Sequence, residues 1–171
     1  MATAIPKPRI NRDMKYAWWQ YPIHFLAYRC GTGLAPFAPG TCGSLVGIVL
    51  FWFMAPLGAG TYAGIVAVLF VFGIFICGQT ARDVGAIDPG FIVYDEIAGF
   101  LVAMYMMPAD WRWIVAGFVI YRGFDIWKPF PIHYVEGHLG LGSGIMTDDV
   151  IAGVYTLTIL QLARFLIDRY V

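Results

Sequence analysis

The fold class of this chain is decided by apolar runs such as Leu45-Val-Gly-Ile-Val-Leu-Phe-Trp-Phe-Met54, which carries no charge. Of the 171 residues, 60% are hydrophobic and 13% are charged, and the mean hydropathy is +0.70. Soluble domains contain about 45–50% apolar and about 25% charged residues, and a small domain leaves much of its surface facing the solvent. The sequence therefore predicts an integral membrane protein whose outer surface faces lipid.

Five apolar segments are expected to form the spans of one helical bundle. A helix needs about 20 mainly apolar residues, at about 1.5 Å each, to cross the hydrocarbon layer. The candidates are residues 43–60, 61–78, 91–107, 111–127 and 150–167. We therefore predict an all-α, polytopic membrane bundle with about five short spans, in which residues 22–171 form a single domain.

The basic residues predict the orientation of this bundle. With the N-terminus in the cytoplasm, most of them fall on the cytoplasmic side, as the positive-inside rule requires. These are Lys7, Arg9, Arg12, Lys15, Arg29, Arg82, Arg122 and Lys128. Residues 1–21 are then expected to form a cytoplasmic or interfacial arm.

Two acidic pairs lie at the cytoplasmic ends of these spans. Asp95 and Glu96 begin one apolar run, and Asp148 and Asp149 open the last one. A charge placed toward the membrane costs about 2.5–3.5 kcal/mol, so such residues normally face a partner, a cavity or an ion. For the second pair an alternative stays open, because acids in a first helical turn complement the helix dipole and Thr147 could be the N-cap.

A third polar group lies at the same end of the bundle. Arg122, Asp125 and Lys128 are spaced i, i+3, i+6 and so are expected along one helical face. Pro129 and Pro131 would end that helix near the water. The pattern sets two cations beside an anion, and the alternative is an intrahelical ion pair with a snorkelling lysine.

The Gly-Pro segment 31–44 precedes the first span. Its glycines let the backbone approach a ligand closely, and Thr41 or Ser44 can cap the following helix. A helix N-terminus with free N–H groups suits a phosphate, but the segment is not a Walker loop because no Gly-Lys-Ser or Gly-Lys-Thr follows. A purely structural loop and cap explains it equally well.

The acids Asp95, Glu96, Asp125, Asp148 and Asp149 would repel one another unless cations lay among them. Oxygen-only ligation suits Mg²⁺, which binds one or two carboxylates and otherwise water and phosphate. Basic side chains beside the acids supply the charge that a phosphoryl group requires. A metal and phosphate site is favoured over two other classes, a cation transporter, which needs polar groups at mid-depth, and a non-catalytic scaffold.

Four ordered motifs now identify a family. They are Ala-Pro-Gly-Thr-x-Gly-Ser (38–44), Tyr-Asp-Glu (94–96), Arg-x-x-Asp-x-x-Lys-Pro (122–129) and Gly-x-Gly-x-Met-x-Asp-Asp (142–149). Their order and spacing, over about residues 18 to 165, closely resemble the phosphatidylglycerophosphatase A family. The family usually has Trp where this chain has Tyr94.

The resemblance implies a multi-pass phosphatase of the bacterial inner membrane with its active site on the cytoplasmic face. It implies Mg²⁺ as the cofactor, a phosphatidylglycerophosphate lipid as the substrate, the membrane as a partner, and no nucleic acid. The matching positions are Asp95, Glu96, Asp148 and Asp149 for metal, Arg122, Asp125 and Lys128 for catalysis, and His24, Thr41, Ser44, Gly142 and Gly144 for the substrate phosphate or headgroup. The number of metal ions and the nucleophile, either water or Asp125, stay open.

Overall fold

A computed structural model of the chain describes residues 39–85, 92–132, 134–135 and 139–170. In this part of the chain the helices longer than two turns are α2 (Pro39–Met54), α3 (Ala59–Val84), α4 (Tyr94–Ala103), α5 (Trp111–Trp127) and α7 (Leu141–Tyr170). The prediction of an all-α fold is confirmed, and α5 has the bounds expected for it. The N-terminal arm, His24 and most of the Gly-Pro segment lie outside the described residues.

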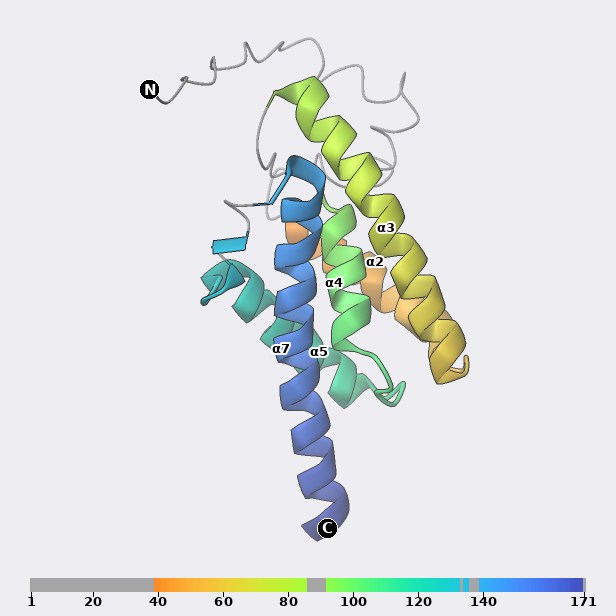
Figure 1. Ribbon diagram of the computed structural model, residues 1–171. Coiled ribbons are helices and arrows are strands. Elements are labelled where there is room, and N and C mark those ends of the chain that lie inside the picture. The colour runs from red at the N-terminus through yellow and green to blue at the C-terminus, as the bar shows by residue number, and fades with distance from the viewer. Residues whose placement is uncertain (1–38, 86–91, 133, 136–138, 171) are drawn as a thin grey trace.

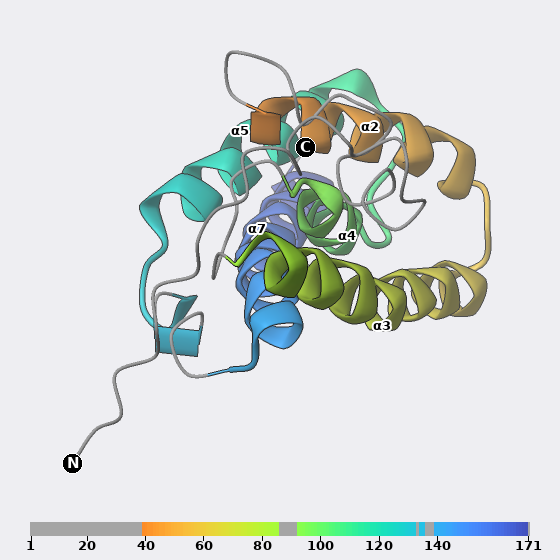
Figure 2. The ribbon, with the colours of Figure 1, turned by 90° about the horizontal axis from the view of Figure 1, so that it is seen from above.

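Helix α4 is the centre of the bundle, and the other four helices surround it (Figures 1 and 2). Of its ten residues, all but Tyr94 and Val102 are buried. The chain alternates in direction, so the N-terminal ends of α2, α4 and α7 lie at the same end of the bundle as the C-terminal ends of α3 and α5 (Figure 1). This connectivity brings the polar segments at those helix ends to one end of the molecule.

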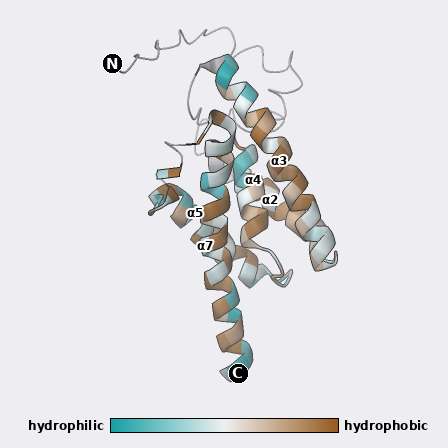
Figure 3. Cartoon of the chain, in the orientation of Figure 1, coloured by the Kyte–Doolittle hydropathy of each residue, from teal (hydrophilic) through white to brown (hydrophobic). Residues whose placement is uncertain are grey.

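Two of the helices, α3 and α7, are long and apolar enough to cross a membrane. Many large hydrophobic side chains are exposed, and hydrophobic residues make up much of α3 (Figure 3). On α3 the outward side chains of Val68, Val71 and Phe75 are each about two-thirds exposed. An apolar surface of this kind is stable against lipid and unfavourable against water.

Helix α4 corrects the expectation of a span over residues 91–107. Its ten residues rise about 15 Å, roughly half of the 30 Å hydrocarbon layer, so α4 does not cross a membrane by itself. The chain turns after Ala103, and Met106 has a positive φ of 57°. The segment is apolar because α4 is buried among the other helices. Hydropathy does not distinguish burial in protein from burial in lipid.

Side chains from neighbouring helices donate to carbonyl groups at the C-terminal end of α4 and in the turn that follows it. A helix end leaves four carbonyls without intrahelical partners, and such groups are costly away from water. The donors are Tyr62 to the Leu101 oxygen at 2.8 Å, Gln161 to the Tyr105 oxygen at 3.0 Å and Arg164 to the Met106 oxygen at 2.8 Å. These bonds allow α4 to end inside the bundle.

Glycines at two crossings let α7 lie against its neighbours. A Cβ atom on Gly142 would overlap the carbonyl oxygen of Ile74 and lie 2.9 Å from the Cα atom of Gly78 on α3. A Cβ atom on Gly153 would overlap the carbonyl oxygen of Gly99 on α4. The second contact holds the acidic turn of α7 directly beside the first turns of α4.

The start of α7 is a second correction. The last span was expected over residues 150–167 with Thr147 as a possible N-cap, but α7 begins at Leu141. Gly142, Gly144 and Thr147 are therefore inside the helix, and Thr147 is not an N-cap. The glycines are tolerated in a helix because the contact with α3 leaves no room for a side chain at Gly142.

Candidate active site

Four carboxylates meet where α4 and α7 lie side by side. Asp95 and Glu96 are in the first turn of α4, and Asp148 and Asp149 lie about two turns into α7. Their exposed fractions are only 6%, 9%, 5% and 4%, respectively. Asp149 interacts electrostatically with the other three and with Asp125, so a concentrated negative charge lies in a buried position.

Two basic side chains approach this charge from the α5 side. Arg122 donates to Glu96 over 3.3 Å and forms a close ion pair with Asp125, one turn further along α5. The Nζ atom of Lys128 lies 2.8 Å from Oδ2 of Asp148. Paired charges of this kind offset part of the cost of burying the carboxylates.

Lys128 does not lie on the helical face that its spacing predicted. Helix α5 ends at Trp127, and Lys128 is the C-cap residue in the left-handed region, with φ 44° and ψ 58°. Its N–H donates to the Phe124 oxygen over 2.8 Å. The turn, rather than the helix, carries the ammonium group to α7, while Arg122 and Asp125 form the i, i+3 pair as expected.

Tyr121 is a site residue that was not predicted. Its ring is fully buried, and its hydroxyl donates to Oδ1 of Asp149 over 2.8 Å. The hydroxyl fits because α4 carries a glycine opposite it, since a Cβ atom on Gly99 would lie 2.5 Å away. A signal was available, because Tyr121 precedes Asp125 by four residues and so shares the face of α5 that carries the site.

The residues expected to contact the substrate headgroup are less closely gathered. Thr41 and Ser44 lie inside α2, which begins at Pro39, so neither is the N-cap that was expected. Ser44 is fully buried and Thr41 is half-buried. Gly142 faces α3 rather than the carboxylates, and the N–H of Gly144 donates to the Gly140 oxygen over 2.7 Å.

The carboxylates of the site suit a Mg²⁺ ion that has one or two protein ligands better than one enclosed by three or more. In the described part of the chain, no three His, Cys, Asp or Glu side chains are close enough to enclose a metal ion. Mg²⁺ is commonly held by one or two carboxylates together with water and phosphate oxygens. One or two of the carboxylates of α4 and α7 would suit that open mode.

A family model described as phosphatidylglycerophosphatase A matches residues 25–164. The chain belongs to this family. Phosphatidylglycerophosphatase A of Escherichia coli K12 is 43% identical over 140 residues, which cover 81% of each chain. Phosphatidylglycerophosphatase A of Haemophilus influenzae is 42% identical over 157 residues, covering 91% of this chain and 96% of its own.

A third relative is named for a different activity. It is a putative phosphatidylinositol-3-phosphatase of Bacteroides thetaiotaomicron, 36% identical over 145 residues, which cover 80% of this chain and 90% of the relative. No solved structure gives a significant match. The phosphatidylglycerophosphatase A family consists of phosphoric monoester hydrolases that convert phosphatidylglycerophosphate to phosphatidylglycerol.

Proposed function

We propose that this chain hydrolyses phosphatidylglycerophosphate with Mg²⁺ at the cytoplasmic leaflet of a bacterial inner membrane. One observation carries the proposal beyond family membership. Carboxylates from α4 and α7 lie within contact of Arg122 and Lys128 at a single end of an apolar bundle. In this arrangement the carboxylates suit a divalent cation, and the basic side chains suit the phosphate group of a monoester.

The basic side chains of the site stabilise the phosphoryl group. Arg122 and Lys128 neutralise negative charge on the phosphoryl oxygens as the ester bond breaks. The bonds of Arg122 to Glu96 and Asp125 fix its guanidinium group before substrate arrives, which reduces the reorganisation needed during reaction. Mg²⁺, held by a subset of the four carboxylates on α4 and α7, would supply Lewis acidity toward the same oxygens.

The acidic side chains of α5 and α7 orient the reactants. Asp125 lies beside Arg122 and is the residue proposed to position the attacking water; a covalent aspartyl-phosphate at Asp125 is the alternative. Tyr121 holds one oxygen of Asp149, so the other oxygen keeps a fixed direction. The roles of His24, Thr41, Ser44, Gly142 and Gly144 in binding the headgroup stay predictions.

The proposed membrane arrangement places all five helices in the bilayer, with α4 crossing only part of it. Among the described residues, Arg82, Arg122 and Lys128 are at the end that carries the site, and Arg112, Arg164 and Arg169 are at the opposite end. The cytoplasmic excess of basic residues therefore depends on the segment before residue 39, which we propose lies in the cytoplasm.

A cation transporter fits this bundle less well. A conduction path requires polar groups at mid-depth. Beyond the carboxylates, the described core consists mainly of apolar side chains such as Phe100, Leu101, Met104 and Leu160, each at most 1% exposed. The hydroxyl groups of Ser44, Thr80 and Thr156 are also buried there. This apolar layer favours chemistry at one face over transport through the bundle.

Metal removal tests the proposal directly. Purified protein with phosphatidylglycerophosphate and Mg²⁺ should release inorganic phosphate, EDTA should stop the release, and an excess of Mg²⁺ should restore it. Activity unchanged by chelation would remove the metal from the mechanism. Phosphatidylinositol-3-phosphate is the control substrate, and phosphate release from it alone would reassign the substrate.

Substitutions of Lys128 separate the effect of its backbone conformation on stability from the effect of its charge on activity. A non-glycine residue in the left-handed region costs about 1–2 kcal/mol, so Lys128→Gly should be more stable than Lys128→Ala by about 1 kcal/mol. Both variants should lose phosphatase activity by at least about tenfold, because both lack the ammonium group. Thermal unfolding in detergent and phosphate release measure the two effects, and full activity in Lys128→Gly would exclude the proposed role.

A further inference from the structure

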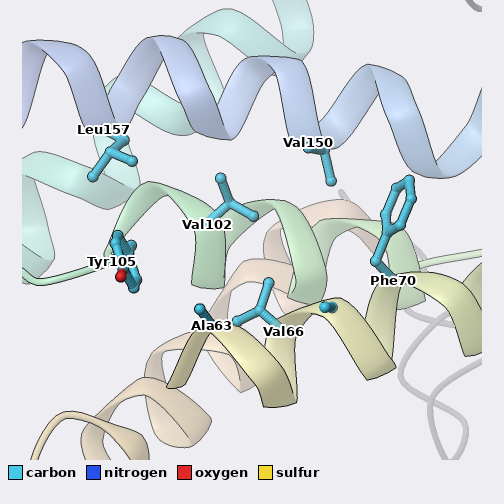
Figure 4. A pocket seen from close by; sticks show the side chains of 8 residues that line it. Ala63, Val66, Phe70, Val102, Tyr105, Val150 and Leu157 are labelled. Atoms are coloured by element: carbon cyan, nitrogen blue, oxygen red, sulfur yellow. The ribbon is translucent and has the colours of Figure 1, made fainter. Parts of the chain in front are cut away.

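Two lateral surfaces of the bundle could bring a lipid to the carboxylates. One is an apolar groove of about 310 Å³ between α3 and α7, with α4 as its floor (Figure 4). It is lined by Ala63, Ala67 and Phe70 of α3, Val102 of α4, and Val150 and Leu157 of α7. The other is the side on which α5 ends.

The groove is closed toward the acidic site. One turn beyond Phe70, a Cβ atom on Gly73 would lie 2.5 Å from the sulfur of Met146, the residue one turn before Val150. One turn further on, Gly142 rests on the α3 backbone at Ile74. A lipid in the groove would have to separate α3 from α7 before its headgroup reached the carboxylates.

The α5 side carries the accessible edge of the site. Side chains within residues 121–128 donate to Glu96, Asp148 and Asp149. The side chain of Lys128 is 26% exposed, whereas that of its partner Asp148 is 7% exposed. A phosphate that approaches from this side meets positive charge before it meets the buried acids.

Three aromatic side chains follow directly at this edge, and we name Trp127, Phe130 and Tyr134 the aromatic tip. Their exposed fractions are 75%, 81% and 56%. The outward face of α5, with Val119 and Ile126 also well exposed, leads straight to them. The end of α5 projects away from α7 in Figure 1.

The aromatic tip is held on the bundle by its own neighbours. Ile132 is buried at its base, and the hydroxyl of Tyr155 on α7 donates to the Phe130 oxygen over 3.0 Å. The rings of Phe124 and Tyr155 lie 5.4 Å apart. The aromatic side chains therefore point outward from a fixed turn whose first residue after the helix is Lys128.

We propose that the aromatic tip docks in the lipid leaflet and that the lipid substrate reaches the acidic site across it. Tryptophan and tyrosine favour the membrane–water interface, where their amphipathic rings lie at headgroup depth. The tip continues the lipid-facing surface of α5, so its partner is the acyl chains and headgroups of that leaflet. This inference rests on the proposed function, and it adds the side of approach.

Fluorescence tests the lipid contact without any reference to activity. In a full-length variant that keeps Trp127 as its only tryptophan, vesicles of phosphatidylcholine brominated near the carbonyl end of the acyl chains should quench most of the emission. Aqueous iodide should quench little of it. Strong quenching by iodide with none from the brominated lipid would overturn the docking.

Kinetics test the side of approach. The double variant Trp127→Ala/Phe130→Ala should raise KM for long-chain phosphatidylglycerophosphate in vesicles by about tenfold with little change in kcat, because it loses binding made equally in ground and transition states. Hydrolysis of the soluble dibutyroyl analogue should not change. Trp111→Ala, an exposed tryptophan at the opposite end of α5, is the matched control and should keep the KM of the parent protein.

Filling the rival groove completes the test. Ala67→Leu should leave KM unchanged, and a raised KM in this variant with none in the tip variant would move the substrate path to the α3–α7 side. If the parent protein releases no phosphate from phosphatidylglycerophosphate, the proposed function fails. The fluorescence measurement then still decides whether the tip contacts lipid.

Discussion

Asp149→Asn is expected to lower the rate of phosphate release by at least about tenfold, and Asp95→Asn should do the same. Asparagine has nearly the same volume as aspartate, and its carbonyl oxygen can still accept the 2.8 Å bond from Tyr121. The substitution removes the negative charge that a divalent ion requires. The measurement is phosphate release from phosphatidylglycerophosphate by protein purified from membranes.

The matched control for Asp149 is on the same helix. Asp168→Asn changes a carboxylate that is 68% exposed and pairs only with Arg164 among the described contacts. It should retain the activity of the parent protein. Full activity in both Asp149→Asn and Asp95→Asn would show that these buried acids are structural and would remove them from the mechanism.

Gly142→Ala is expected to have the largest effect on stability. The new methyl group would overlap the Ile74 carbonyl oxygen and press on Gly78, both of which are backbone atoms that cannot move aside. Overpacking of this kind costs about 1–3 kcal/mol or more. Thermal unfolding in detergent should show a clear loss of stability together with a loss of activity.

Gly64→Ala is the matched control for this substitution. Gly64 lies on α3, one of the two helices that meet at Gly142, and no atom lies within 4 Å of a Cβ atom built there. Alanine at that position should leave stability unchanged or raise it, because alanine favours helix more than glycine. A Gly142→Ala protein that kept its stability but lost its activity would instead support the headgroup contact that the sequence predicted.

Charge placement made much of the site predictable from sequence. An ionised side chain at the edge of an apolar run must face protein or an ion, so the ends of several runs had to meet. Helix α5 has the predicted bounds, with Asp110 as the cap at its start and Pro129 directly after its C-cap residue. The bonds from Arg122 to Glu96 and from Lys128 to Asp148 join the segments that the sequence brought to one end.

The features that were not predicted depend on contacts between residues that are far apart in the sequence. Hydropathy measures how apolar a segment is and does not tell whether lipid or protein surrounds it. The short helix α4, which protein surrounds, therefore resembled a full span. Gly142 resembled a loop glycine because the backbone that excludes a side chain there belongs to α3, more than 60 residues away in the chain. Tyr121 resembled an ordinary core residue until Asp149 was found opposite its hydroxyl.

The apolar core beside α4 limits where the products of the reaction can leave the protein. In the described part of the bundle, the carboxylates rest on a closely packed apolar layer, and the end of α4 below it is sealed by bonds from Tyr62, Gln161 and Arg164. Inorganic phosphate freed at the acids meets no polar route onward through that layer. It is therefore expected to leave through the same face of the protein by which the water enters.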